Sequence, residues 1–262
     1  MKITDIHCHI FPDKIARKAS KAIGDFYGIP MAYDGTREKL KELARERGVT
    51  RMLIHSVASN ASQVEHINDY IAESVRLYPD LFSGFATMHP DYPDISGEID
   101  RAVGLGLLGV KIHPDMQKFA IDDPAAYPIY EAIEGRLPIL VHTGDYRYNY
   151  SHPYMMAKVM RDFPRLAVIG AHFGGYSEID EVEKAYKGLP VMIDTSSSLF
   201  YMSPERAAGL IRKFGVENTM FGTDYPMWDY GEELERFMKI PLTDREREDI
   251  LYNNAKERLG IG

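Results

Sequence analysis

Short hydrophobic runs alternate along this chain with longer segments in which the apolar residues recur every three or four positions. The short runs are rich in Val, Ile and Leu and end at polar or turn-forming residues, which is typical of strands. Eight strands are predicted, at residues 3–9, 51–57, 82–88, 109–113, 138–142, 167–171, 191–194 and 219–224.

The longer segments between these runs indicate helices. In the segment 62–77, for example, Ile67, Ile71 and Val75 share one helical face. Ser96 is the expected N-cap of its helix, because its hydroxyl can accept a hydrogen bond from a free backbone N–H. Helices are predicted at residues 38–47, 62–77, 96–103, 127–134, 154–163, 177–186, 203–214 and 242–259.

Eight strands, each followed by a helix, predict a (β/α)₈ TIM barrel, a fold with a usual size of about 250 residues. The chain has 262 residues and no linker or low-complexity tract divides it, so a single α/β domain over residues 1–262 is expected. The alternative is an open doubly wound sheet, which normally carries a glycine-rich phosphate loop after an early strand. The first predicted strand ends in His-Cys-His-Ile-Phe-Pro instead, which disfavours that alternative.

Composition narrows the classes of partner. The 31 basic and 39 acidic residues give a net charge of −8, which argues against nucleic acid or an anionic membrane as partner. No apolar run approaches the roughly 20 residues that span a bilayer, and the first residues lack a signal-peptide layout. Because Cys8 is the only cysteine, no intrachain disulfide can form, and a cytoplasmic location is expected.

Histidine is concentrated at the ends of the predicted strands. The C-terminal ends of the strands form the rim that carries the active site in (β/α)₈ enzymes. Seven of the 9 histidines lie at or next to such an end: His7, His9, His55, His89, His113, His142 and His172. The last predicted strand adds Asp224 to the same rim. This distribution predicts an active site built largely from imidazoles.

His7 and His9 form the sharpest local motif, because residues two apart in a strand share one face at about 6.6 Å along it. Both imidazoles can reach one ion while Cys8 points to the other side as a buried hydrophobe. His142 and Asp224 can complete a site of three nitrogens and one carboxylate oxygen. Such a site suits one Zn²⁺ ion, with Mn²⁺ or Fe²⁺ as alternatives, and leaves room for a water.

Six longer motifs occur in order along nearly the whole chain. They are DIHCH at 5–9, GVKIHP at 109–114, PILVHTG at 138–144, GAHFGG at 170–175, FGTDYP at 221–226 and NNA at 253–255. They resemble the amidohydrolase superfamily, and in particular its amidohydrolase-related branch of aminocarboxymuconate semialdehyde decarboxylase-like enzymes. The resemblance implies a distorted (β/α)₈ barrel, one divalent metal ion held by His7, His9, His142 and Asp224, and a catalytic His172 beside the metal.

Each implied catalytic role has a simpler alternative. Asp224 is expected to be both a metal ligand and the general base that takes a proton from water, whereas a helix cap or turn residue is the alternative. His172 is expected to act as an electrophile or proton shuttle, and a hydrogen-bonded core histidine is the alternative.

Lys111 and His113 share one strand face and are candidates for substrate binding. In binuclear members of the superfamily a lysine on this strand is carbamylated and bridges two metals. Three roles stay open for Lys111: a carbamate ligand, an ammonium that holds a substrate carboxylate, or a rim lysine paired with an acid. The ammonium is favoured because lysine is a natural anchor for anions.

The loop 145–152 carries three tyrosines and Arg147, whose guanidinium can hold a carboxylate with two parallel hydrogen bonds. A solvated surface loop is the alternative. His55 and His89 are further substrate-binding candidates on the rim.

The sequence favours a metal-dependent hydrolase that attacks a small carboxylated ester, lactone or amide through a metal-activated water. A nonoxidative metal-dependent decarboxylase is the main alternative, and a catalytically inert metal-binding barrel is the second. The chain is shorter than typical decarboxylases of the branch, and many of those carry Glu-x-His where this chain has His7 and His9. The expected partner is a small molecule. A homodimer stays open, since family members are often dimers.

Overall fold

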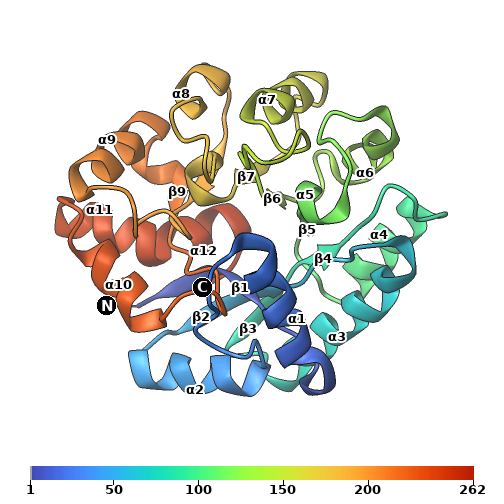
Figure 1. Ribbon diagram of the computed structural model, residues 1–262, viewed down its shortest axis with the longest axis horizontal. Coiled ribbons are helices and arrows are strands. Elements are labelled where there is room, and N and C mark those ends of the chain that lie inside the picture. Colours follow the sequence, from blue (N-terminus) through green and yellow to red (C-terminus); the bar gives the residue numbers. More distant parts are fainter. Residues whose placement is uncertain (1) are drawn as a thin grey trace. The chain divides into compact units, whose positions relative to one another are not determined.

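The computed structural model of the protein describes residues 2–262, which form two compact units. The first unit contains residues 2–55, Glu73–Ser83 and Thr195–Gly262, and the second contains Ser56–Ala72 and Gly84–Asp194. Helix α3 (Val64–Leu77) begins in the second unit and ends in the first. The labels and colours of Figure 1 allow the elements of each unit to be followed along the chain.

The sheet of the first unit has the order β1-β2-β3, with β1 at Thr4–His9, β2 at Arg51–His55 and β3 at Phe82–Gly84. β1 and β2 are parallel, and their register sets the Cα of His9 opposite that of His55. Cys8 of β1 also forms a parallel bridge with Tyr225, which follows the short strand β9 (Thr219–Met220). The carboxyl end of β1 is therefore bonded both to β2 and to the segment around residue 225.

Helices cover the strands of the first unit. They are α1 (Asp13–Tyr27), α2 (Arg37–Arg47), α9 (Pro204–Phe214), α10 (Tyr230–Met238), α11 (Asp244–Glu248) and α12 (Asn254–Leu259). Helix α2 begins after Thr36, whose side chain accepts a hydrogen bond from the Lys39 N–H. It buries Leu40 and Leu43 and ends at Gly48, which has the left-handed conformation that favours glycine.

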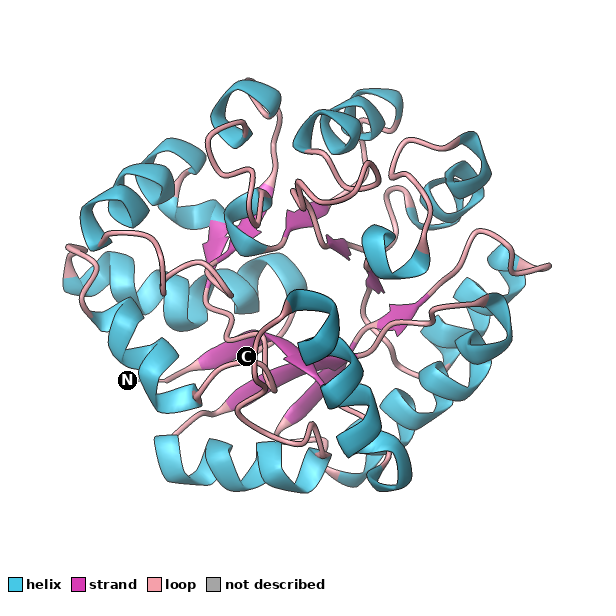
Figure 2. Ribbon diagram, in the orientation of Figure 1, coloured by secondary structure: helices cyan, strands magenta, loops and turns pink. Residues whose placement is uncertain are grey.

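The second unit contains five strands that pair in parallel with their successive neighbours. They are β4 (Ala86–Thr87), β5 (Val110–Ile112), β6 (Ile139–Val141), β7 (Val168–Gly170) and β8 (Met192–Asp194). The helices of this unit are α4 (Ile95–Gly104), α5 (Pro114–Gln117), α6 (Tyr127–Ile133), α7 (Pro153–Asp162) and α8 (Val182–Ala185). All residues of these strands are buried, and Figure 2 shows each short strand leading through a loop to a helix.

The prediction of one continuous strand at residues 82–88 is wrong. The segment 82–88 forms two strands: β3 joins the sheet of β1 and β2, and β4 pairs with β5. The Leu108 N–H donates to the Gly84 carbonyl, and the Ala86 N–H donates to the carbonyl of Gly109 beside β5. The other seven predicted strands are present, each within a few residues of its predicted bounds.

Three predicted helices differ in detail. The N-cap of α4 is Asp94, whose carboxylate accepts from the Gly97 N–H at 3.0 Å, and not Ser96. The predicted helix 177–186 is reduced to the short α8, because 175–181 forms single turns instead. The predicted helix 242–259 is interrupted by a π-helical turn at Asp249–Asn253, where the Ile250 carbonyl accepts a hydrogen bond from the Phe221 N–H.

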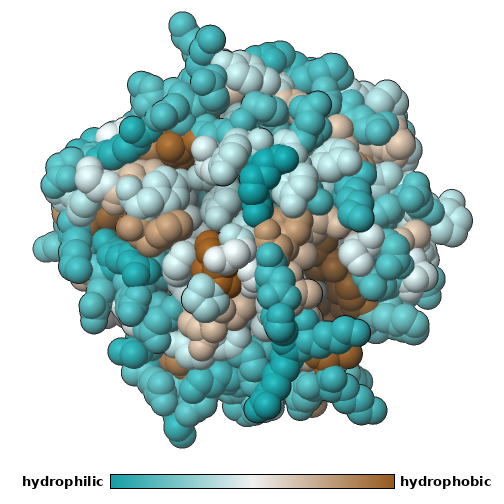
Figure 3. Space-filling view, viewed as in Figure 1, coloured by the Kyte–Doolittle hydropathy of each residue, from teal (hydrophilic) through white to brown (hydrophobic). Residues whose placement is uncertain are grey.

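The face of the molecule in Figure 3 is mostly hydrophilic, with separate small hydrophobic areas. Among residues 2–262, no helix combines the length and the apolar character that crossing a membrane requires.

Candidate active site

Three predicted metal ligands meet in the first unit. His7 and His9 are side chains of β1, and the Asp224 N–H donates to the His7 carbonyl at 2.9 Å, which sets Asp224 beside that strand. The Nε2 atoms of the two histidines are 3.3 Å apart. Asp224 Oδ1 lies 3.4 Å from His7 Nε2 and 3.5 Å from His9 Nε2. Two ring nitrogens and one carboxylate oxygen thus form a nearly equilateral triangle.

This triangle fits a divalent metal ion. Donor atoms at 2.0–2.1 Å from a tetrahedral ion are roughly 3.3–3.4 Å apart, so the three observed separations match one face of a tetrahedron. Neutral imidazole nitrogen and carboxylate oxygen are donors that such ions prefer. One further coordination position is left for another ligand or a substrate atom.

The backbone around Asp224 is unusual. Asp224 has φ +61°, in the left-handed region that non-glycine residues rarely adopt. Its other carboxylate oxygen, Oδ2, accepts a hydrogen bond from Ser197 Oγ at 2.5 Å. Ser197 itself has φ +47°. Such conformations persist only where the surroundings hold them, and they are concentrated at functional sites.

Asp5 ties β1 to the turn that carries Asp224. Its carboxylate accepts hydrogen bonds from the N–H of His7 at 2.9 Å, from the N–H of Thr223 at 3.1 Å and from the Thr223 hydroxyl at 2.6 Å. Burial raises the pKa of Asp5 to about 6, although these hydrogen bonds act in the opposite direction. Asp5 therefore fixes the position of two segments that each supply predicted metal ligands.

His55 belongs to the same cluster. The register of β1 and β2 brings its ring to 4.4 Å from that of His9 and 5.0 Å from that of His7, both edge to face. A ring nitrogen of each of the three histidines lies within 4.8 Å of the other two. The structure thus places this predicted substrate-binding residue beside the two histidines predicted as metal ligands.

The second unit holds another cluster of histidines. His142 Nδ1 and His172 Nε2 are 2.9 Å apart in a hydrogen bond. The rings of His113 and His142 stack at 3.8 Å with an angle of 8° between their planes. Because the lone pairs of stacked rings run parallel instead of converging, this pair is poorly suited to hold one ion between them. The prediction that His142 is the fourth metal ligand stays a prediction.

Asp115 is a buried residue of this cluster that the sequence analysis missed. One of its carboxylate oxygens lies 3.7 Å from His142 Nε2. Burial raises its pKa to about 7. The only sequence signal for it is its position directly after His113-Pro114, in the short helix α5.

His172 stands in a strained turn after β7. His172 and Phe173 have φ values of +59° and +55° and are followed by Gly174 at +78°. The backbone N–H of His172 donates to Asp194 Oδ1 at 3.0 Å, which fixes the turn to the end of β8. The catalytic role of His172 stays a prediction, and the strain supports a functional position for it.

The remaining predicted residues of the second unit have different surroundings. Lys111 is fully buried on β5. His89 is buried too, and its Nδ1 accepts a hydrogen bond from the Asp91 N–H at 3.2 Å. The Arg147 guanidinium forms two hydrogen bonds to the Asp145 carboxylate, at 2.9 and 2.6 Å. Binding of a substrate carboxylate by Arg147 stays a prediction, and it would compete with Asp145.

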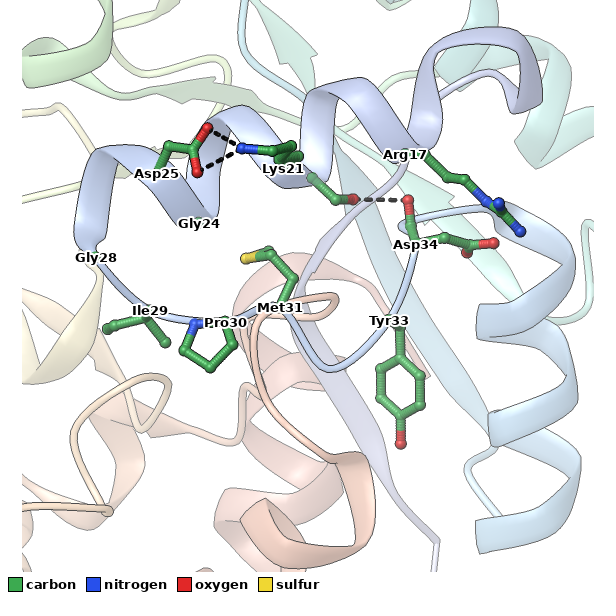
Figure 4. Close-up of a pocket in the computed structure, with 11 residues that line it drawn as sticks. Arg17, Lys21, Gly24, Asp25, Gly28, Ile29, Pro30, Met31, Tyr33 and Asp34 are labelled. Carbon is green, nitrogen blue, oxygen red and sulfur yellow. Dashed lines mark hydrogen bonds and ion pairs between the residues drawn. The ribbon is translucent and has the colours of Figure 1, made fainter.

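A separate pocket of 620 Å³ lies between helix α1 and the loop that follows it (Figure 4). Lys21 pairs there with Asp25 at 2.6 Å, and the Ser20 hydroxyl donates to the Asp34 carbonyl at 2.6 Å. None of the residues that line this pocket belongs to the predicted site.

Comparison with known proteins places the chain in a family. A family model described as Amidohydrolase matches residues 4–261. The chain belongs to the amidohydrolase family. This amidohydrolase is 24% identical over 242 residues to a 2-amino-3-carboxymuconate-6-semialdehyde decarboxylase of Dictyostelium discoideum. The match covers 75% of this chain and 66% of the length of that relative.

Solved structures similar to this amidohydrolase cover nearly the whole chain. An uncharacterized TIM-barrel protein from Bordetella bronchiseptica has a TM-score of 0.78 at 22% identity, covering 99% of this chain and 98% of that one. The 5-carboxyvanillate decarboxylase LigW from Sphingomonas paucimobilis has 0.77 at 19% identity, covering 100% and 99%. A probable 2-pyrone-4,6-dicarboxylic acid hydrolase from Acinetobacter baumannii, solved with citric acid, has 0.73 at 16% identity, covering 99% and 100%.

These likenesses confirm the predicted (β/α)₈ barrel fold. The family match identifies the protein as a metal-dependent enzyme of the amidohydrolase superfamily. The donor triangle of His7, His9 and Asp224 agrees with the divalent metal ion that this family binds.

Proposed function

We propose that this amidohydrolase is a nonoxidative decarboxylase that acts on a small carboxylated substrate. The observation that carries the proposal is the donor triangle of His7, His9 and Asp224, in a chain similar to two enzymes named as decarboxylases. The sequence alone favours hydrolysis. The comparisons support its decarboxylase alternative better, and we therefore put decarboxylation first.

The metal ion of the proposed enzyme is held by His7, His9 and Asp224, with His142 as the fourth ligand that the family resemblance implies. We propose Zn²⁺, because the triangle has the edge length of a tetrahedral site, with Mn²⁺ and Fe²⁺ as alternatives. When bound, such an ion polarises a substrate oxygen and stabilises negative charge that develops on it.

Decarboxylation requires the protein to assist the breaking of a carbon–carbon bond and to supply a proton to the remaining carbon. The bond between carbon and the departing carboxylate breaks, its electron pair stays on that carbon, and CO₂ leaves. A proton must then be delivered to the same carbon to form the new C–H bond. We assign this delivery to Asp224, whose ionised carboxylate takes up a proton from water during turnover and passes it to the carbon, with His172 as the alternative donor.

The buried residues of the second unit supply the proposed binding of the substrate. Lys111, fully buried on β5, is proposed to hold a substrate carboxylate through its ammonium group. The imidazole of His172 is kept in place by its hydrogen bond to His142. In the proposal it donates a hydrogen bond to a substrate oxygen.

Hydrolysis of a carboxylated lactone is the second candidate. It is favoured by the likeness to a probable 2-pyrone-4,6-dicarboxylic acid hydrolase and by the His-x-His pair at residues 7 and 9. In this case Asp224 would take a proton from the attacking water instead of delivering one to carbon.

The test compares two products from the zinc-loaded enzyme. Carboxylated aromatic acids and muconates are assayed for release of CO₂, and carboxylated lactones for release of acid. The proposal predicts CO₂ release that a chelator abolishes and Zn²⁺ or Mn²⁺ restores. Acid release from lactones without CO₂ from any acid of the panel would establish the second candidate instead. Activity on neither class with metal bound would favour an inert barrel.

A further inference from the structure

We propose that Ser197, held by Trp228, is a positioning residue that fixes Asp224 for metal binding. The inference rests on the proposed metal centre and concerns only residues of the first unit. In this proposal a chain of hydrogen bonds from Trp228 through Ser197 supports the ligand Asp224, and neither Trp228 nor Ser197 belongs to the sequence motifs.

The direction of the hydrogen bonds in this chain follows from chemistry. Trp228 Nε1 lies 2.7 Å from Ser197 Oγ, and an indole N–H can only donate. Ser197 Oγ therefore accepts that hydrogen bond and donates its own hydrogen to Asp224 Oδ2 at 2.5 Å. An ionised carboxylate can only accept, which agrees with this direction. The three groups form a chain of two hydrogen bonds, from the indole of Trp228 to the hydroxyl of Ser197 and from that hydroxyl to the carboxylate of Asp224, which we call the relay.

The relay determines which oxygen of Asp224 faces the histidines. With Oδ2 held by Ser197, the carboxylate presents Oδ1 to His7 and His9, at 3.4 and 3.5 Å. Rotation of the carboxylate would break a short hydrogen bond between groups that are both buried. A carboxylate fixed in this way needs less ordering when a metal ion binds.

The backbone conformations support a functional role for the pair. Ser197 and Asp224 both have left-handed φ values, +47° and +61°, which side chains rarely allow. Two such residues lie in two separate segments, and their side chains meet in one hydrogen bond. The strained backbone at each position directs its side chain toward the other.

Ser196 and Ser198, on either side of Ser197, show which serine hydroxyls of this turn contact a proposed metal ligand. Ser196 Oγ lies 3.1 Å from His7 Nδ1, so it contacts a second metal ligand on the side away from Nε2. Ser198 is equally buried, but its hydroxyl donates to the Ser196 carbonyl at 3.1 Å. Loss of the Ser198 hydroxyl therefore removes a buried hydrogen bond of the same turn with no metal ligand as its partner.

The ring of Trp228 has a packing role that can be separated from its N–H. It stacks on Phe200 with 4.5 Å between the ring centroids. Phenylalanine at position 228 keeps an aromatic ring for this contact and removes the donor to Ser197. The variant Trp228→Phe thus tests the relay more directly than alanine would.

The experiment measures the Zn²⁺ affinity of the full-length protein by competition with a chromophoric chelator. We expect Ser197→Ala to weaken binding by about 10- to 100-fold. Trp228→Phe should weaken it by a smaller factor. Ser198→Ala should stay within about twofold of the wild-type protein. Equal affinities for Ser197→Ala and Ser198→Ala would overturn the proposal.

A second variant separates positioning from folding. Glycine accepts φ +47° without strain, so Ser197→Gly should keep or raise the melting temperature while it still loses zinc affinity. If Ser197→Gly bound zinc as tightly as the wild-type protein, the hydroxyl would have no positioning role. A wild-type protein that binds no zinc would instead refute the metal centre itself, and the two failures are therefore distinct.

Discussion

The Cα atoms of His9 and His55 are partners in the parallel register of β1 and β2, and their rings meet edge to face at 4.4 Å. His55 is fully buried. We expect His55→Ala to lower the free energy of unfolding by roughly 2–4 kcal/mol, because it leaves a cavity against His9. Urea denaturation measures this change.

The same variant distinguishes a supporting residue from a metal ligand. If His55 supports His9 by packing, His55→Ala binds Zn²⁺ more weakly but still measurably, whereas His9→Ala loses the ion. Complete loss of zinc from both variants would make His55 a ligand in its own right.

His7 and His172 should respond differently to the same substitution. His7→Ala removes one corner of the donor triangle, and the purified variant should contain no stoichiometric metal. His172→Ala should keep the metal and lose most turnover, because the proposed role of His172 is toward the substrate. Elemental analysis and steady-state rates of both variants check this, and a full metal content in His7→Ala would count against its assignment as a ligand.

Gly144 is expected to be intolerant of any side chain. A Cβ there would lie 2.5 Å from Gly175 Cα, and its φ of +83° is itself strained for other residues. Gly144→Ala should destabilise the protein by about 3–5 kcal/mol, since overpacking adds to backbone strain. Gly188→Ala is the matched control, with φ +75° and nothing within 4 Å of an added Cβ. Gly188→Ala should lower the free energy of unfolding by only about 1–2 kcal/mol, measured by thermal or urea unfolding. Equal losses would mean that contact with Gly175 is unimportant.

Stability should fall as the pH rises through neutrality because of Glu233. Burial raises its pKa to about 7 from the ordinary 4.5, although its hydrogen bond from Arg236 acts in the opposite direction. The folded protein therefore holds this proton more tightly than the unfolded chain does. The resulting stabilisation is complete below pH 4.5 and is lost as the pH passes 7.

The variant Glu233→Gln isolates this contribution. Urea unfolding at pH 5 and pH 8 should show that the free energy of unfolding of the wild-type protein falls by about 2–3 kcal/mol more than that of the variant between these two values. The same pH dependence in both proteins would refute the assignment to Glu233.

The strands and the meeting of the His7 and His9 imidazoles on one face of β1 could be predicted from the sequence because both depend on local patterns. Helix α1 was missed for a physical reason. Its buried face consists of the small residues Ala16, Ser20 and Gly24, whereas the larger Ile15 is 50% exposed, so no large apolar side chains mark that face in the sequence. Helix α10 was missed similarly, since Gly231 and Glu233 are among its buried residues.

The residues that support the site could not be predicted from sequence patterns. Ser196 and Ser197 read as part of a polar loop, yet both are fully buried against ligands from distant segments. Asp115 likewise gains its surroundings only when β5 and β6 pair. Such contacts between distant segments depend on the folded structure and leave no local pattern in the sequence.

Anomalous diffraction at the zinc absorption edge, from crystals of the zinc-loaded protein, tests the central claim most directly. We expect an anomalous peak bonded to His7 Nε2, His9 Nε2 and Asp224 Oδ1. The absence of a peak at these three atoms in fully loaded protein would contradict it.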